Sequence, residues 1–434
     1  MNNKKEGVLM QPEIKHGSAP RLRFPEFRDA EAWRFQPLEK LAKRSTRKNT
    51  DGELTRVLTN SAEYGVVDQR DFFDKDIANQ ENLKGYYVVE YGSYVYNPRI
   101  SATAPVGPIS KNKISTGVMS PLYTIFTFNS SQNDFYAHYF KSKHWHHYMR
   151  QSSSTGARHD RISITNDAFM KLPLPISTPE EQQKIADCLS SLDELLMLKM
   201  LKLDAFKKRK AGLLQKLFPA KGEMLPKLRF PEFYDSGKWE RKELSEFLFE
   251  YQNRNRNLKY GPQDVLSVSG EHGCLNQIEH LGRSYAGASV KDYRVVENGD
   301  IVYTKSPLKR NPFGIIKENK GRAGIVSTLY AVYRAKESAR PSFFDHYFSR
   351  DYFLNAYLEP LVKKGAKNDM KVNNLAVLSG HVVAPLTEEQ QKIADCITSI
   401  NDLITVYVKE LDALKRHKKA LLQQLFSISD EEQG

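Results

Sequence analysis

The sequence contains an internal duplication, and this duplication constrains the fold more than any other feature. The segment PRLRFPEF at positions 20–27 returns as PKLRFPEF at 226–233, and EEQQKIADC at 180–188 returns unchanged at 388–396. A nine-residue identity in matching order is far beyond chance, so the chain holds two copies of one unit. Between these anchors the resemblance is faint. Two copies of one scaffold that carry different surfaces give this pattern.

The middle of each copy is predicted to be an α+β domain. Runs such as Tyr123–Phe128 and Tyr330–Tyr333 are rich in β-branched and aromatic residues. Gly, Pro and Asn separate such runs, as they separate strands in folded proteins. Helical patterns lie between them, at 135–150 and 343–361.

Each copy ends in a segment that is predicted to form a long helix. The first opens at Thr178-Pro-Glu-Glu181, where Thr178 can cap the helix, Pro179 suits the first turn and Glu181 completes a capping box. The second opens at Thr387, which we expect to be its cap. Neither segment contains an internal proline before Pro219 ends the first.

Apolar residues step by four and three along both helical segments, which is the spacing of a coiled-coil seam. Two equivalent rods of about 40 residues, each roughly 60 Å long, pair most simply with each other in antiparallel orientation. The alternative, in which each rod packs on its own domain, stays open. The predicted seam comprises Ile185, Leu189, Leu192, Leu196, Leu203, Ile393, Ile397, Ile400, Ile404 and Leu411.

Charge and cysteine content restrict the class of partner and the compartment. The 434 residues carry a formal net charge of +13, which favours polyanionic partners and above all nucleic acid, although a merely basic soluble protein is the alternative. Hydrophobic residues at 40% exclude a disordered chain. Three cysteines without a CxxC motif suit a reducing cytoplasm. No apolar run approaches the length of a membrane span, so we expect a cytoplasmic protein.

Taken together, these motifs resemble the specificity subunit of Type I restriction-modification systems. Each copy opens with PxLRFPEF followed by Trp33 or Trp239, and LPLP at 172–175 leads into EEQQKIA. A Lys-rich helix then ends in LLQKLF at 213–218. The resemblance extends from about Pro20 to Phe426. The 19-residue lead before it is a departure from the family pattern.

The resemblance implies a non-catalytic chain that reads DNA. Each variable middle would be a target recognition domain for one half of a bipartite, asymmetric target, and the helices would set the spacing and dock two methyltransferase (M) subunits. S-adenosylmethionine, ATP and Mg²⁺ would bind to the M subunits and to the restriction/translocase (R) subunits, and none to this chain. The expected parts are an N-terminal lead (1–19), recognition domain 1 (20–177), spacer helix 1 (178–219), recognition domain 2 (220–385), spacer helix 2 (386–426) and a tail (427–434).

Basic and amide side chains in loop-like segments are the candidates for contact with double-stranded DNA, because base edges need hydrogen-bonding forks and phosphates need cations. Exposed charges without a ligand are the alternative for each segment. The candidates are Arg44, Arg47, Lys48, Asn97, Arg99, Arg158, Arg254, Arg256, Lys305, Lys309, Arg310 and Lys367.

Patterns that would indicate catalysis in this chain are incomplete. Tyr96-Asn-Pro98 lacks the second proline of the adenine methyltransferase motif. Asp300 with Glu318 and Lys320 has the outline of a nuclease metal site, but the first copy has no counterpart. We therefore predict no catalytic and no metal site. The alternative function is a free-standing DNA-binding coiled-coil adaptor or nuclease that acts without partner subunits.

Overall fold

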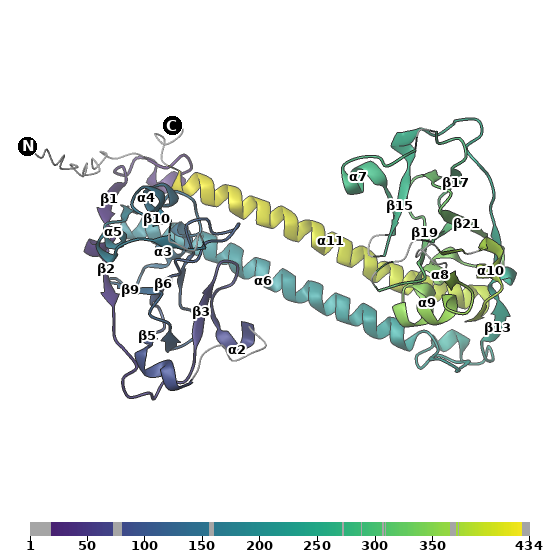
Figure 1. Ribbon diagram of the computed structural model, residues 1–434, viewed down its shortest axis with the longest axis horizontal. Coiled ribbons are helices and arrows are strands. Elements are labelled where there is room, and N and C mark those ends of the chain that lie inside the picture. The colour runs from purple at the N-terminus through teal and green to yellow at the C-terminus, as the bar shows by residue number, and fades with distance from the viewer. Residues whose placement is uncertain are drawn as a thin grey trace, which may run out of the picture. The chain divides into compact units, whose positions relative to one another are not determined.

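The structure is a computed structural model that describes residues 19–72, 80–155, 160–270, 273–287, 289–305, 308, 310–364, 370–371 and 373–427. The chain divides into two compact units (Figure 1). One unit comprises the residues up to Leu198 together with those from Glu410, and the other comprises Lys199–Lys409. Each unit therefore contains one α+β domain and parts of both long helices.

The first unit is built on a four-stranded antiparallel sheet with the order β2-β9-β6-β7. Two-stranded pairs β1-β12, β3-β4, β5-β8 and β10-β11 accompany it. The strands are β1 (Arg34–Pro37), β2 (Ala42–Ser45), β3 (Leu58–Ser61), β4 (Gly65–Asp68), β5 (Tyr87–Val89), β6 (Tyr94–Tyr96), β7 (Ile109–Lys111), β8 (Gly117–Met119), β9 (Thr124–Phe128), β10 (Ser154–Thr155), β11 (Ile162–Ser163) and β12 (Pro173–Ile176). The short helices are α1 (Leu38–Leu41), α2 (Gln69–Phe72), α3 (Asp134–Tyr139), α4 (His146–Gln151) and α5 (Asn166–Met170).

The second unit repeats this plan, with a four-stranded sheet in the order β14-β21-β18-β19 and the pairs β13-β24, β15-β16, β17-β20 and β22-β23. The strands are β13 (Glu240–Glu243), β14 (Leu248–Glu250), β15 (Leu266–Ser269), β16 (Gly273–Asn276), β17 (Arg294–Val296), β18 (Ile301–Thr304), β19 (Ile315–Glu318), β20 (Gly324–Val326), β21 (Tyr330–Ala335), β22 (Lys363–Lys364), β23 (Met370–Lys371) and β24 (His381–Ala384). The short helices are α7 (Gln277–Leu281), α8 (Pro341–Phe348), α9 (Asp351–Leu358) and α10 (Asn374–Leu378). The predicted α+β class and internal repeat are confirmed.

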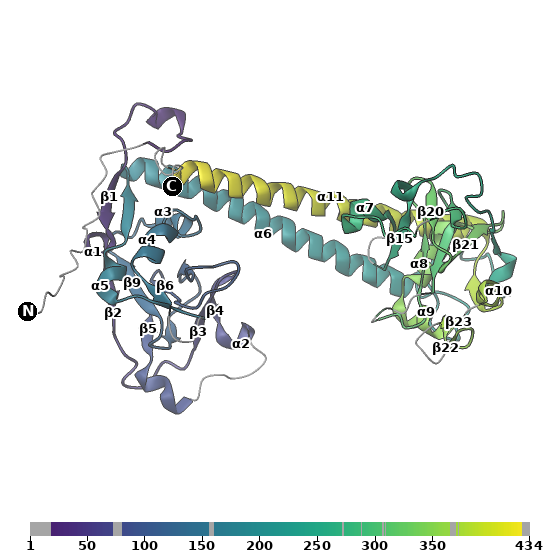
Figure 2. The ribbon, with the colours of Figure 1, turned by 45° about the horizontal axis from the view of Figure 1, so that its top comes forward.

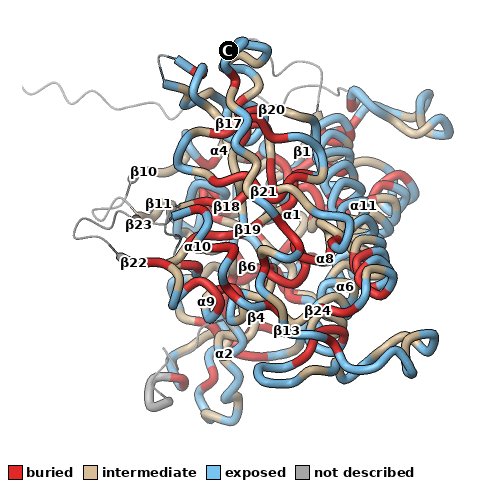
Figure 3. Tube along the Cα trace, turned by 90° about the vertical axis from the view of Figure 1, so that its right-hand side faces the viewer, coloured by how far each residue is buried: buried red, intermediate tan, exposed pale blue. Residues whose placement is uncertain are grey.

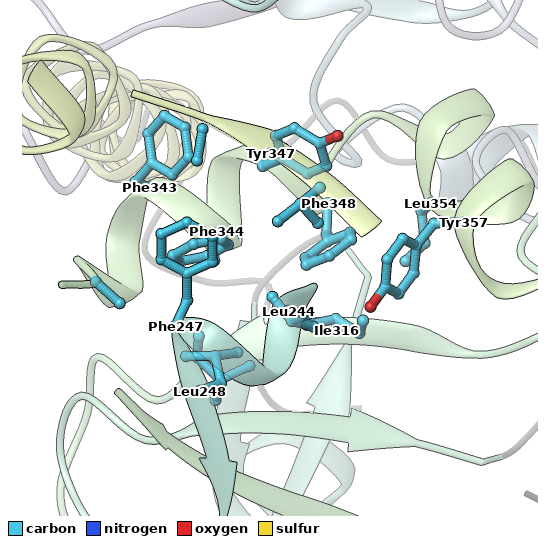
Figure 4. Packing of buried hydrophobic residues seen from close by; sticks show 14 of the residues in the cluster. Leu244, Phe247, Leu248, Ile316, Phe343, Phe344, Tyr347, Phe348, Leu354 and Tyr357 are labelled. Atoms are coloured by element: carbon cyan, nitrogen blue, oxygen red, sulfur yellow. The ribbon is translucent and has the colours of Figure 1, made fainter. Parts of the chain in front are cut away.

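Aromatic side chains fill the core of each domain (Figure 3 shows the burial along the trace). In the second domain, Phe343, Phe344 and Phe348 of α8 belong to one packed cluster with Leu244 and Ile316 (Figure 4). The continuous helices expected at 135–150 and 343–361 are each two short helices instead. Between α3 and α4 the chain turns so that Trp145 enters the core and donates to the carbonyl of Phe140 at 3.1 Å.

The two long helices, α6 (Pro179–Lys216) and α11 (Thr387–Phe426), pack together (Figures 1 and 2). In the first unit the start of α6 shares a core with the end of α11, through Ile185 and Phe426. In the second unit the start of α11 shares a core with Phe218, which follows α6. The helices are therefore antiparallel, as predicted. The alternative, in which each long helix packs on its own domain, is also partly correct, because the first turns of each helix lie in the core of the domain that precedes it.

None of the ten predicted seam residues is exposed. Six are buried, namely Ile185, Leu189, Ile393, Ile397, Ile400 and Leu411, and four are half-buried, namely Leu192, Leu196, Leu203 and Ile404. Aromatic packing replaces aliphatic packing between Phe206 and Tyr407, whose ring centroids are 5.3 Å apart. No helix in the described ranges is long and apolar enough to cross a membrane.

One of the two predicted helix caps is confirmed and the other is wrong. Thr178 does cap α6, because its hydroxyl accepts from the N–H of Glu181 at 3.2 Å. Leu386, not Thr387, occupies the equivalent position before α11, since the N–H of Gln390 bonds to the carbonyl of Leu386 as that of Gln182 bonds to Thr178. The predicted capping box at Glu181 is wrong, because that carboxylate has other partners.

Glu181 joins the entrance segment of the first domain to α6. Its carboxylate accepts from Nε and Nη2 of Arg23 at 2.6 and 2.7 Å, and from the indole N–H of Trp33 at 3.1 Å. The Trp33 ring also contacts that of Phe426, at the end of α11, with ring centroids 6.4 Å apart. One buried carboxylate thus ties three segments that are far apart in the sequence.

The second domain repeats this clamp at the corresponding residues. Glu389 accepts from Nε and Nη2 of Arg229 at 2.8 and 2.7 Å and from Trp239 at 3.2 Å. Trp239 lies against Phe218, again with ring centroids 6.4 Å apart. The duplicated motifs of the sequence are therefore the parts of the clamp. We call each arginine–glutamate–tryptophan set the frame clamp.

Replacing Glu181 with Gln should lower the free energy of unfolding by about 3 kcal/mol, because it leaves the Arg23 guanidinium buried without its counter-charge. Denaturant unfolding of the purified chain measures this change. The neighbouring exposed Glu180→Gln is the matched control and should have almost no effect. Equal losses in the two variants would contradict the role of the clamp.

Two equivalent histidines make stability depend on pH. Nε2 of His138 lies 3.0 Å from the Ser190 hydroxyl, and Nε2 of His346 lies 3.2 Å from that of Thr398. Burial is the main cause that lowers the pKa of both from 6.5 to about 3. The unfolded chain therefore binds these protons at a higher pH than the folded chain does, and acid favours unfolding.

We expect the stabilisation that the two neutral histidines give the folded state to be complete above about pH 6.5. It should be lost as the pH falls toward 3, by up to about 1.4 kcal/mol per pH unit for each histidine. Denaturant unfolding at about pH 7 and about pH 5 measures the slope. His138→Gln should reduce the slope by one proton, whereas the exposed His147→Gln should leave it unchanged. An unaltered slope in His138→Gln would overturn this assignment.

Candidate nucleic-acid interface

The basic segment 43–49 of the first domain is held by a buried asparagine. Asn49 donates to the carbonyls of Leu54 and Leu83 at 2.9 and 3.3 Å, and its side-chain oxygen accepts from the N–H of Leu54. Arg47 and Lys48 precede it and are exposed. Arg47 pairs with Glu90 at 3.0 Å across the surface. A rigid turn thus presents two cations to solvent.

The segment 253–257 of the second domain has the same support. Asn255 donates to the carbonyls of Tyr260 and Val290 at 2.8 and 3.3 Å, and accepts from the N–H of Tyr260. Arg254 and Arg256 flank it and approach the Asp292 carboxylate to 3.7 and 3.2 Å. Sequence reasoning missed the role of both asparagines. The signal was an Asn kept at the repeat offset within segments that otherwise differ.

A polar pocket of about 560 Å³ opens beside this second segment. Amide and cationic side chains dominate its walls, and the charge and hydrogen-bonding groups suit an anionic or base-edge ligand. The lining residues are Gln252, Asn253, Arg254, Arg256, Asn257, Lys259, Tyr260, Val295 and Glu297.

Asn97 and Arg99 lie in a segment that contacts the hairpin β10–β11. The backbone of Arg99 pairs with Arg161, which lies next to β11, and the Arg99 guanidinium is exposed 3.7 Å from Asp160. The structure therefore brings the segment 96–99 and the hairpin β10–β11 together. The Asn97 amide donates to the carbonyl of Asn60 at 2.9 Å, and its oxygen accepts from the N–H of Arg99 at 3.0 Å. In the described state this amide supports the turn.

The corresponding region of the second domain contains Lys305 and Arg310. Lys305 is half-buried, and burial followed by the neighbouring Arg294 lowers the pKa of its ammonium group. Arg310 is exposed, and its carbonyl accepts from the Asn355 amide at 3.0 Å. Three further candidates, Arg158, Lys309 and Lys367, fall outside the described residues.

Two glycines fix the turns that follow these segments. Gly107 and Gly314 have φ values of 79° and 92°. A Cβ on either would meet the carbonyl oxygen of Asn97 at 2.1 Å or of Thr304 at 1.9 Å. Only glycine fits at such a close approach of two backbones. The candidate loops therefore end in rigid turns.

The residues that outlined a nuclease site are bound to other side chains, and Nζ of Lys320 lies 3.4 Å from Glu318 and 3.0 Å from Asp345. Asp300 binds the Arg334 guanidinium at 2.9 Å. Glu318 accepts from the Ser342 hydroxyl at 2.6 Å. Within the described ranges, no group of three His, Cys, Asp or Glu side chains could hold a metal ion.

Comparison with known proteins gives a family match and two curated relatives. Residues 58–204 match the family model of the Type I restriction modification DNA specificity domain. The putative type I restriction enzyme MjaX specificity subunit of Methanocaldococcus jannaschii is 22% identical over 281 residues, which cover 62% of this chain and 61% of that protein. The type I restriction enzyme MjaVIII specificity subunit of the same organism is 23% identical over 297 residues, covering 64% and 65%. The match thus spans less than two thirds of either relative.

One solved structure shares the fold over almost its full length. It is the crystal structure of the Type-I restriction-modification system S subunit from M. genitalium, with a TM-score of 0.56 and 14% sequence identity. The superposition covers 94% of this chain and 99% of that one. These comparisons confirm the resemblance that the duplicated motifs predicted: residues 58–204 match the Type I restriction modification DNA specificity domain, and the chain shares the fold of a solved S subunit.

Proposed function

We propose that this chain is the non-catalytic DNA specificity subunit of a Type I restriction-modification complex. Each recognition domain reads one half of a bipartite, asymmetric target. The observation that carries the proposal is the combination of two identical frames with different exposed residues. Both domains have the frame clamp and the same sheet order, and in both a buried asparagine holds a basic segment.

The difference between the basic segments supports an asymmetric target. Arg47 and Lys48 of the first domain correspond to Asn253 and Arg254 of the second. Because these residues precede equivalent buried asparagines, their backbones are held in the same way while their donors differ. Different donor sets on one backbone select different base pairs. The remaining candidate residues, including Arg99, extend each surface to phosphates and bases.

The helix pair supports the second half of the proposal, in which it fixes the gap between half-sites and docks two M subunits. On α6, Met197 and Leu198 are 62% exposed and Leu201 is 57% exposed. Contiguous exposed apolar residues on a long helix are typical of a surface that a partner covers. The R subunits join through this assembly, and the partners bind S-adenosylmethionine, ATP and Mg²⁺.

Co-expression with the cognate M subunit, followed by genome-wide mapping of methylated adenines, tests the function. We expect a split motif with unequal halves and a fixed gap. Absence of methylation, in a preparation in which the two subunits associate, would refute the proposal. DNA cleavage by the purified chain alone would instead favour the free-standing nuclease.

Docking through the exposed face of α6 predicts that Met197→Glu combined with Leu201→Glu weakens association with the M subunit at least tenfold, because two apolar contacts are replaced by charges. Sedimentation or titration calorimetry measures the Kd. Lys207→Glu, an exposed change on the same helix, is the matched control for added charge. An M-subunit affinity unaffected by the double variant would place docking elsewhere.

A further inference from the structure

One position in the common frame carries opposite charges in the two domains. Arg44 on β2 pairs across the sheet with Phe126, and Glu250 on β14 pairs with Tyr333 in the equivalent register. The strand beside each basic segment contributes a second residue at this place. It is the residue whose backbone pairs with the basic segment, namely Tyr87 in the first domain and Arg294 in the second.

In the second domain these residues form a pair that is largely shielded from solvent. Nη1 of Arg294 donates to Glu250 at 2.8 Å, and their side chains are 13% and 7% exposed. The Asn374 and Gln252 amides donate to the same carboxylate. Within the described part of the chain, Glu250 is the only hydrogen-bonding partner of the Arg294 guanidinium. Its other N–H groups keep their donor capacity.

Lys305 adds a second cation at this place. Arg294 is, after burial, the largest cause that lowers the pKa of Lys305, whereas Glu250 acts in the opposite direction. Two cations therefore lie near one carboxylate in a half-buried setting. Placing them together costs free energy that an incoming electron-rich group offsets.

The fold itself does not require the ion pair. The first domain has the same backbone register without a carboxylate at this position, and Arg44 stands where Glu250 does. Nε of Arg44 is buried and makes no hydrogen bond to any described residue. A buried donor without an acceptor costs about 1–3 kcal/mol. This cost points to a ligand that supplies the acceptor.

The position also adjoins the candidate DNA surface. Gln252, which donates to Glu250, lines the polar pocket, as does Arg254, whose backbone pairs with Arg294. In the first domain, Lys48 of the basic segment pairs in the same way with Tyr87. Both positions therefore lie beside a basic segment.

Resting on the proposed function, we infer that Arg44 and Arg294 each read the acceptor edge of a guanine, one in each half of the target. Glu250 is a positioning residue that holds one side of the Arg294 fork. A guanidinium held on one side presents its other donors in a fixed geometry, which suits the O6 and N7 atoms of guanine. Arg44 approaches from a different strand of the frame, so the two domains place the guanine differently.

The test uses the full chain with its M subunit and measures binding to duplexes in which each base pair of the target is changed in turn. In Arg294→Gln, we expect discrimination at one G·C pair of one half-site to fall about 5- to 150-fold, the range for loss of a bidentate contact. Arg44→Gln should have the same effect at one G·C pair of the other half. Glu250→Gln should weaken discrimination at the pair that Arg294 reads.

Arg34→Gln and Arg322→Gln, which replace exposed arginines of the first and second domains, are the matched controls. Thermal unfolding checks each variant, and Arg44→Lys and Arg294→Lys, which retain the charge but lose the fork, replace any variant that fails to fold. An equal loss of affinity for all duplexes would assign these arginines to phosphates and overturn the inference, as would an unchanged preference. If the wild-type complex methylates no bipartite motif, the proposed function itself fails.

Discussion

The structure depends on two buried carboxylates, Glu181 and Glu389. Each accepts from two N–H groups on one edge of an arginine guanidinium and from an indole N–H, so its charge is satisfied inside the protein. Loss of any one partner destabilises the protein, because it leaves the remaining buried groups without water and without a hydrogen bond. The clamp therefore fixes the direction in which each long helix leaves its domain.

Because the clamp occurs twice, the two domains can differ widely without changing the frame. The residues that stay the same between copies are those that satisfy buried backbone groups, such as Asn49 and Asn255, or that fit where no side chain fits, such as Gly107 and Gly314. Exposed residues on the candidate DNA surface are not needed for these two purposes, so they can differ between the copies. One scaffold can thus carry two unrelated recognition surfaces.

The sequence was sufficient for the parts of the fold that depend on repetition and periodicity. The duplication, the α+β class and the antiparallel helices all follow from spacing, which is visible in one dimension. The candidate interface was harder to predict from the sequence. A basic residue looks the same whether it is exposed, like Arg99, or half-buried, like Lys305. The amide of Asn97 was a candidate for contact with DNA, yet in the described state it bonds to the backbone. The Glu250–Arg294 pair joins strands 44 residues apart and has no counterpart in the first copy that could have revealed it.

The arrangement in which each helix ends on the other domain has a consequence for synthesis of the chain. The first domain emerges first from the ribosome, but its core includes Leu425 and Phe426, which are made only after the whole second domain. The second domain needs Phe218, which has already been made, and Ile397, which precedes Phe426 by several helical turns. The domain that is translated second therefore completes its core first, and the core of the first domain is completed only when the end of α11 has been made.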